Sequence, residues 1–234
     1  MNYTVAILAG GLATRLRPIT EKIPKALVEV AGKPFILHQL EDLRRQGFTK
    51  VVLCLGYLGE QVENLLGNGA FMDLDIKYSW DGNPLLGTGG ALKKALPMLD
   101  NHFFVYYGDS FLPIDFAAVA KDFETKHKPA LMTVLQNSNR WDTSNVLFQN
   151  GQIVEYNKQD PRQEMLFIDY GLGILSASLL GAMPDGQPFD LATLYHELSI
   201  KGLLSGFEVF ERFYEIGSHK GLEETCAYFE RKEK

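Results

Sequence analysis

A chain of 234 residues that is 46% hydrophobic and 22% charged can bury one substantial core, which excludes disordered, collagen-like and coiled-coil proteins. The formal net charge of −6 argues against a nucleic-acid-binding protein, because such proteins usually carry a basic excess that matches the phosphate backbone. No apolar run approaches the roughly 20 residues that span a bilayer, so we expect a cytoplasmic protein without a membrane partner, folded as a single domain over residues 1–234.

The first half of the chain alternates short β-branched runs with amphipathic stretches. Strands are predicted at Thr4–Leu8, Lys50–Leu55, Asp75–Trp80 and Phe103–Tyr107, and helices at Pro34–Gln46, Leu58–Leu66 and Thr88–Leu96. This alternation predicts βαβ units and a largely parallel sheet with helices on both faces. In such sheets, ligands bind beyond the carboxyl ends of the strands.

From Ala130 onward, the pattern predicts antiparallel strands that extend the same sheet. Asn150-Gly151 separates two strand-like runs and favours a type I′ hairpin turn, and Asp190 is a suitable N-cap. The predicted strands are Ala130–Leu135, Asn145–Gln149, Gln152–Tyr156, Phe167–Leu175 and Phe207–Phe210, and the predicted helices are Asp190–Lys201 and Leu222–Arg231. The expected fold is a Rossmann-like three-layer α/β/α arrangement around a mostly parallel mixed sheet.

A glycine pair, Gly10-Gly11, follows the first predicted strand. Paired glycines let the backbone approach a ligand and expose amides to phosphate oxygens, although the same pair could serve only as a tight turn. The loop lacks both the G-x-G-x-x-G fingerprint and the P-loop pattern. Arg15 and Lys25 favour a triphosphate site, because a guanidinium forms bidentate bonds to phosphate oxygens and an ammonium supplies a point charge.

The segment Leu8–Pro34 reads LAGGLATRLRPITEKIPKALVEVAGKP, with the glycine pair, TRLRP, PK and GKP in order. It resembles the signature of the sugar-nucleotide pyrophosphorylase (sugar-1-phosphate nucleotidyltransferase) family. The resemblance implies that the Gly10–Arg15 loop holds the base and triphosphate of an NTP and that Lys25 binds phosphate around the transition state. The nucleotide-binding residues that it implies are Leu8, Ala9, Gly10, Gly11, Thr14, Arg15, Lys25, Asp81, Gly87 and Thr88.

Two carboxylates are candidates for a magnesium site. Asp109 comes just after the predicted strand Phe103–Tyr107, where a loop or N-cap aspartate is the alternative interpretation. Magnesium prefers one or two carboxylates together with substrate phosphates and waters. By the same resemblance, Glu215 in the segment Tyr214–Gly217 is the second ligand, in a position where the family more often has aspartate. We therefore expect Mg²⁺ as the cofactor and Arg15, Lys25 and Asp109 as the catalytic residues.

The remaining expectations for ligand-binding residues also follow from the resemblance. Leu86–Leu92 is similar to the family's LGTAGAL segment, which implies base contacts at Gly87 and Thr88, with Asp81 in the stretch before them. Lys158 matches a sugar-phosphate lysine, with a solvated loop lysine as the alternative, whereas Asn157 departs from the family's acidic residue. The implied sugar-phosphate-binding residues are Asn145, Asn157, Lys158, Asp169 and Gly171, of which Asp169 either binds a sugar hydroxyl or caps a turn.

Four later segments look most like the subgroup that acts on heptose 1-phosphate, namely Arg140–Asp142, Ser144–Val146, Ile168–Gly171 and Phe213–Ser218. That similarity implies transfer of a guanylyl group from GTP to D-glycero-D-manno-heptose 1-phosphate, with pyrophosphate released and GDP-heptose formed for surface polysaccharide. A uridylyl-, cytidylyl- or thymidylyltransferase for another sugar 1-phosphate remains an alternative, as does a sugar-nucleotide-binding regulatory module without catalysis. The five histidines show no metal-ligand spacing and most of them are expected at the surface, and Cys54 and Cys226 are expected as buried free thiols. The oligomeric state is left open, a homo-oligomer included.

Overall fold

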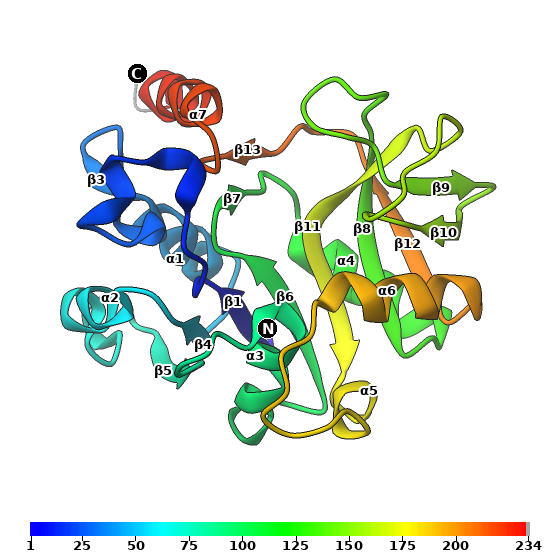
Figure 1. The fold of residues 1–234 in the computed structure, drawn as a ribbon, viewed down its shortest axis with the longest axis horizontal. Helices are drawn as coiled ribbons and strands as arrows, with labels where there is room; N and C mark the ends of the chain where they lie inside the picture. The colour runs from blue at the N-terminus through cyan, green and yellow to red at the C-terminus, as the bar shows by residue number, and fades with distance from the viewer. Residues whose placement is uncertain (233–234) are drawn as a thin grey trace.

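The computed structural model describes residues 1–232, which contain a nine-stranded mixed sheet (Figure 1). Its main path runs in the order β10-β9-β11-β6-β1-β4-β5, while β8 pairs with β11 and β12. The strands are β1 Thr4–Leu8, β4 Lys50–Leu55, β5 Asp75–Trp80, β6 His102–Tyr107, β8 Ala130–Gln136, β9 Val146–Gln149, β10 Gln152–Tyr156, β11 Phe167–Ser176 and β12 Leu204–Val209.

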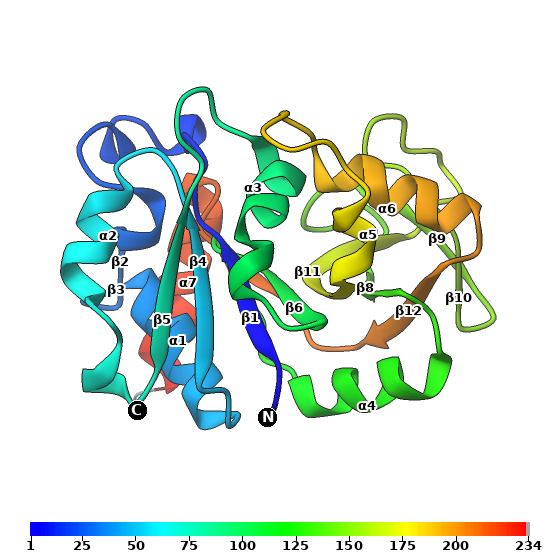
Figure 2. The same cartoon turned by 90° about the horizontal axis from the view of Figure 1, so that it is seen from below.

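Helices cover both faces of this sheet, which confirms the expected Rossmann-like three-layer fold. The helices are α1 Phe35–Arg45, α2 Gly59–Leu66, α3 Gly87–Ala95, α4 Phe116–Lys126, α5 Ala177–Gly181, α6 Leu191–Ile200 and α7 His219–Lys232. One apolar core holds buried residues of α1, α2 and α4, and a second holds those of α3, α5 and α6. Figure 2 shows α3, α5 and α6 on one side of the sheet and α4 on the other.

The parallel register of the central strands decides where the site forms. β1 lies between β4 and β6, so that Leu8 is opposite both Cys54 and Tyr107. The loops that follow β1 and β6 therefore leave the sheet at the same edge, as expected for parallel neighbours. Two short two-stranded ribbons lie outside the main sheet. β2 Glu29–Val30 pairs with β3 Lys33–Pro34, and β7 Ser110–Phe111 pairs antiparallel with β13 Tyr214–Glu215.

The structure corrects several predictions. β12 is parallel to β8, not antiparallel, because the chain crosses over through α5 and α6 before β12 enters the sheet. α4 and α5 were not predicted. For α4 the signal was present, since buried Phe116, Val119, Ala120 and Phe123 follow helical spacing.

Cys226 differs from expectation, because it is only partly buried. Among the histidines, His38 is buried, with Nε2 2.9 Å from Val30 O. The predicted hairpin between β9 and β10 is present, and Asp190 caps α6 by accepting the Ala192 N–H. Within residues 1–232, no helix is both long and apolar enough to cross a membrane.

Candidate active site

Asp109 lies in the tight turn between β6 and β7. Gly108 lets this turn pass close to β1: its N–H bonds to Leu8 O at 3.0 Å, and a Cβ at this position would lie 2.7 Å from the same oxygen. Lys25, in a short 3₁₀ turn after Pro24, places Nζ 2.9 Å from Asp109 Oδ2. The cationic segment after β1 and the carboxylate after β6 therefore face each other across one cleft.

Glu215 and Arg15 join the same cleft from other parts of the chain. Glu215 pairs with Ser110 in the β13–β7 ribbon, and the Ile216 N–H bonds to Asp109 O at 2.9 Å. A Cβ at Gly217 would lie 2.7 Å from Glu215 Oε2, 3.2 Å from Arg15 Nη2 and 3.5 Å from Asp109 Oδ2. Two carboxylates and a guanidinium thus converge on one small space, which stays open because residue 217 is glycine.

The buried side chain of Gln39, on α1, holds the turn that carries Asp109. Its Nε2 donates to Tyr107 O at 3.1 Å and to Ser110 O at 2.7 Å, so it bonds on both sides of Asp109. Both bonds are partly buried, and leaving such a carbonyl without a donor is costly. Sequence reading missed Gln39, because its partners lie about 70 positions away in the chain.

Replacing Gln39 by leucine should lower the free energy of unfolding by about 1–3 kcal/mol, because both carbonyls lose their donor. Urea unfolding measures this loss. The matched control is Gln136→Leu at an exposed position at the end of β8, which should change the free energy of unfolding by less than about 0.5 kcal/mol. Equal effects of the two substitutions would show that the bonds of Gln39 do not support the turn.

The glycine loop after β1 packs tightly at Gly10 and is open at Gly11. A Cβ at Gly10 would lie 3.1 Å from Gly56 N and 3.3 Å from Asp81 Oδ2, whereas one at Gly11 would meet no atom within 4 Å. Asp81 is 8% exposed, and its Oδ1 is a buried atom without a hydrogen-bond partner in the described residues. Burial raises the pKa of Asp81 above its ordinary value, while the Leu86 N–H and Lys94 oppose this shift. The loop and Asp81 are therefore neighbours, as the expected nucleotide site requires.

Thr88, in the first turn of α3, contacts the first turn of α6 with its side chain. Its Oγ1 donates to Asp190 Oδ1 at 2.7 Å and accepts the Leu191 N–H at 2.8 Å. At Gly87, which has a φ of +71°, a Cβ would lie 2.7 Å from Phe189 O. The side chain of Thr88 is therefore occupied in joining two helices, so any base contact in this turn falls to the backbone.

A polar hollow of about 580 Å³ opens beside Asp109 and Glu215. Four of the five expected sugar-phosphate residues line it, namely Asn145, Lys158, Asp169 and Gly171. Asn157 is not among the lining residues, because its Oδ1 accepts the N–H groups of Gln159 and Asp160 in a local turn. Sequence reading also missed several lining residues, which are Tyr107, Ser110, Arg212, Gly221 and Glu224, whereas Arg140, Trp141 and Ser218 lie in segments that carry the resemblance to the heptose 1-phosphate subgroup.

Asp169 is the most strongly perturbed acid of this hollow. Burial, which disfavours the charged carboxylate, raises its pKa from 3.8 to about 6, although the Gly171 N–H, Lys158 and Tyr107 oppose the shift. Its Oδ1 accepts the Gly171 N–H at 3.0 Å, and its own N–H donates to Asn145 Oδ1 at 3.0 Å. The chain thus places a carboxylate where ionisation is unfavourable, which is typical of functional residues.

The raised pKa of Asp169 should make the free energy of unfolding depend on pH. The unfolded chain ionises Asp169 near its ordinary pKa and the folded chain near 6, so this residue lowers the free energy of unfolding as pH rises from about 4 to about 6. Asparagine cannot ionise, so Asp169→Asn should raise the free energy of unfolding at pH 7.5 by about 1–3 kcal/mol. The gain should vanish near pH 4 in urea titrations. A gain that is independent of pH would contradict this assignment.

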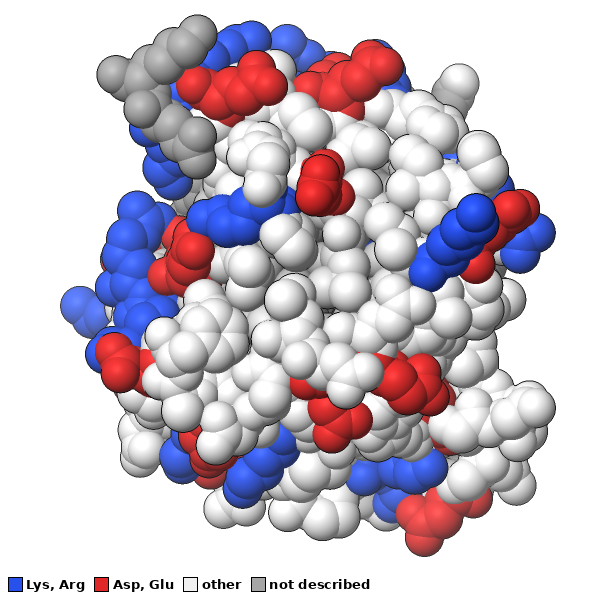
Figure 3. Space-filling view, turned by 90° about the vertical axis from the view of Figure 1, so that its left-hand side faces the viewer, with Lys and Arg blue, Asp and Glu red and all other residues white. Residues whose placement is uncertain are grey.

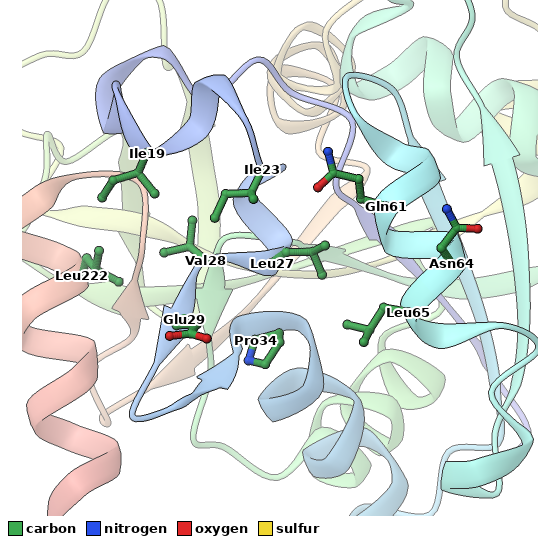
Figure 4. A pocket seen from close by; sticks show the side chains of 10 residues that line it. All are labelled: Ile19, Ile23, Leu27, Val28, Glu29, Pro34, Gln61, Asn64, Leu65 and Leu222. Carbon is green, nitrogen blue, oxygen red and sulfur yellow. The ribbon is translucent and has the colours of Figure 1, made fainter.

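A second hollow of about 750 Å³ lies between α2, the β2–β3 ribbon and α7, and it is apolar. Figure 4 shows Gln61, Asn64 and Leu65 entering it from α2 and Leu222 from α7. The other lining residues are Ile19, Ile23, Leu27, Val28, Glu29 and Pro34. On the face drawn in Figure 3, acidic and basic residues are interspersed among wide uncharged areas. Glu29 is the one charged residue among those that line this hollow. The apolar hollow therefore lacks the cations that phosphates need, and we place the candidate site in the polar hollow.

Known proteins are similar to this chain in both sequence and fold. The model of the family described as Nucleotidyl transferase matches residues 4–145, which include the glycine loop, Lys25 and Asp109. The D-glycero-alpha-D-manno-heptose 1-phosphate guanylyltransferase of Campylobacter jejuni is 37% identical over 140 residues, which cover 60% of this chain and 62% of that protein. The UTP–glucose-1-phosphate uridylyltransferase of Synechocystis sp. is 30% identical over 216 residues, which cover 84% of this chain and 55% of that protein.

Among solved structures, HddC from Yersinia pseudotuberculosis complexed with GMP-PN is similar over almost the whole fold. The TM-score is 0.83 at 25% sequence identity, and the match covers 97% of this chain and 99% of that one. The chain spans 55–62% of the length of the two curated relatives above. Because the family model matches more than half of the residues of this chain, the chain belongs to the nucleotidyl transferase family.

Proposed function

We propose that this protein transfers a nucleotidyl group from an NTP to a sugar 1-phosphate and releases pyrophosphate. The observation that carries the proposal is the convergence of Lys25, Arg15, Asp109 and Glu215 in one cleft, with the Lys25 and Asp109 side chains 2.9 Å apart. Phosphoryl chemistry of this kind depends mainly on positioning and on neutralising charge. The polar hollow beside these residues supplies the room and the donors for a sugar 1-phosphate.

The reaction forms one phosphorus–oxygen bond and breaks another. An oxygen of the sugar phosphate attacks the α-phosphorus of the NTP in line, and the bond from the α-phosphorus to the bridging oxygen of pyrophosphate breaks. A phosphate monoester is mostly dianionic near neutral pH, since its second pKa is about 6, so no side chain has to remove a proton. Arg15 and Lys25 neutralise charge on the triphosphate, and Lys158 binds the sugar phosphate.

Asp109 and Glu215 fit a magnesium ion. Both are carboxylates, they converge on the space beside Gly217, and Mg²⁺ is usually bound by one or two carboxylates together with substrate phosphates. When bound there, Mg²⁺ would add positive charge at the triphosphate oxygens. The two side chains come from the paired β7–β13 region, so their spacing is set by backbone hydrogen bonds and not by loops alone.

GTP and D-glycero-D-manno-heptose 1-phosphate are the substrates that we propose, with GDP-heptose for surface polysaccharide as the product. The relative in Campylobacter jejuni and the GMP-PN complex of HddC support this choice. Asp81 Oδ2 lies beside the glycine loop and Oδ1 is a buried acceptor without a partner in the described residues, which suits a base with an amino donor, as guanine, adenine and cytosine have. Uracil and thymine lack such a group.

A substrate matrix tests the proposal. GTP, CTP, UTP, dTTP and ATP are each combined with heptose, mannose, glucose and N-acetylated sugar 1-phosphates in the presence of Mg²⁺, and pyrophosphate is measured. We expect the highest kcat/KM for GTP with heptose 1-phosphate. A different best pair would overturn the substrate assignment but keep the reaction. Nucleotide binding without pyrophosphate release from any pair would favour a non-catalytic binding module.

A further inference from the structure

Glu215 is held by the first turn of α7, and this holding is more extensive than a strand-end glutamate needs. Its Oε1 accepts the Ser218 hydroxyl at 2.6 Å, and its Oε2 accepts the Gly217 N–H. Ser218 Oγ in turn accepts the Gly221 N–H at 3.0 Å. Because the single hydroxyl proton of Ser218 points to Glu215, the acceptor side of Ser218 caps α7 while its donor side fixes the carboxylate.

Gly221 provides the space that this arrangement occupies. A Cβ at position 221 would overlap Glu215 Oε1 and Cδ, and it would lie 2.7 Å from Glu215 O. Glycine in the interior of a helix is unfavourable by about 0.5–1 kcal/mol relative to alanine. The third residue of α7 is therefore one that weakens the helix and leaves room for the folded-back carboxylate.

A buried hydroxyl ties the same helix to the backbone of Glu215. Thr225 is fully buried, and its Oγ1 lies 2.8 Å from Glu215 O and 2.7 Å from Gly221 O. α7 thus contacts both the main chain and the side chain of Glu215. Each carboxylate oxygen of Glu215 accepts one hydrogen bond from this turn, which leaves a further lone pair on each for another ligand.

We propose that Ser218 and Gly221 are positioning residues that hold the Glu215 carboxylate beside Asp109 for a divalent cation. The inference rests on the proposed function, because it takes Glu215 as a metal ligand. Residues that orient a ligand contribute to metal affinity although they do not touch the metal. The start of α7 is therefore part of the metal site, and a change in this turn should weaken metal binding.

Gly221→Ala tests the inference without removing any polar group. The Glu215 side chain must rotate away from the new methyl group, and the start of α7 must also shift because that group would lie 2.7 Å from Glu215 O, so the thermal midpoint should fall. We expect the Kd for Mn²⁺ alone, measured by electron paramagnetic resonance in the absence of nucleotide, to rise roughly 10-fold or more. The KM for Mg²⁺ in pyrophosphate release should rise in parallel. The matched control is Gly181→Ala at the end of α5, where a Cβ meets no atom within 4 Å, and it should leave both values unchanged.

A double-mutant cycle separates displacement of Glu215 from damage to the helix. Aspartate is one methylene shorter than glutamate, so its carboxylate lies farther from position 221. Gly221→Ala should therefore raise the Kd for Mn²⁺ by a clearly smaller factor in a Glu215→Asp background than in the wild type. If Gly221→Ala does not fold, the variant Ser218→Ala tests the positioning role instead. It removes the donor to Glu215 Oε1 and should weaken Mn²⁺ binding about 10-fold, whereas Ser218→Thr keeps the hydroxyl and most of the affinity.

The outcomes distinguish this inference from the function on which it rests. Wild-type protein that binds no Mn²⁺, either alone or with GTP present, would remove the metal site, and the inference with it. Wild type that binds Mn²⁺ while Gly221→Ala or Ser218→Ala binds it equally well would overturn the positioning role alone. The positioning role would also be overturned if Gly221→Ala raised the Kd for Mn²⁺ by the same factor with glutamate and with aspartate at position 215.

Discussion

Lys25→Ala should lower kcat for pyrophosphate release by about 10²–10³-fold, which is the loss typical when one preorganised charge is removed from a transition state. The Lys25 side chain is 20% exposed and lies 2.9 Å from Asp109 Oδ2, so the protein holds it in place before substrate arrives. Its role in the proposed reaction is to neutralise charge on the phosphates, and a shorter neutral side chain cannot do this. The measurement is steady-state pyrophosphate release with saturating NTP and sugar 1-phosphate.

Lys22 offers a matched control, because it is an exposed lysine three positions before Lys25 in the same segment. Lys22→Ala has the same net charge as Lys25→Ala and should retain kcat within about twofold. Circular dichroism and the unfolding midpoint show whether both variants fold. If folded Lys25→Ala turned over as fast as Lys22→Ala, Lys25 would not be a catalytic residue.

Asp109→Asn should have an effect at least as large, because it removes a proposed metal ligand together with the partner of Lys25. Metal ions stabilise transition-state charge by several kcal/mol, so we expect kcat to fall on the order of 10³-fold and the KM for Mg²⁺ to rise. The side chain keeps its size, and the main-chain bond from Ile216 N to Asp109 O remains. Loss of the fold is therefore not the expected cause. Pyrophosphate release is measured over a range of Mg²⁺ concentrations.

The control for this variant is Asp73→Asn, whose side chain is 80% exposed and lies 3.4 Å from Arg44 at the surface. It carries the same change of charge and should leave both kcat and the KM for Mg²⁺ unchanged, since exposed ion pairs contribute little. Wild-type dependence on Mg²⁺ in Asp109→Asn would remove Asp109 from the metal site. A loss of activity in both variants would trace the effect to net charge.

The sequence predicted the central strands well because their signal is local. β1, β4 and β5 begin and end at the predicted residues, since β1 and β4 are short, mainly apolar runs and β5 alternates polar and apolar residues. The direction of β12, in contrast, does not follow from a local signal. It depends on which edge of the sheet the chain reaches after α5 and α6, and no local pattern contains that information. The fold class could therefore be predicted, but the pairing of the last strand could not.

The site divides in the same way. Strand ends and a glycine loop were enough to predict that Lys25 and Asp109 meet, although they lie 84 positions apart in the chain. Gln39 and Gly221 were not found, because their roles depend on which atoms fold back against them. Thr88 stays a prediction as part of a base site, and the bond that joins its side chain to α6 is a contact that no motif predicts. Backbone geometry is predictable from motifs, whereas the supporting contacts appear only in three dimensions.

The central claim is that this cleft joins the α-phosphate of an NTP to a sugar phosphate. Incubation with GTP labelled at the α-phosphorus, heptose 1-phosphate and Mg²⁺ tests it most directly. We predict that the label enters a nucleotide sugar in amounts equal to the pyrophosphate released, and that both products require both substrates. Label that remains in GTP, or that appears only in GMP or GDP without sugar attached, would contradict it.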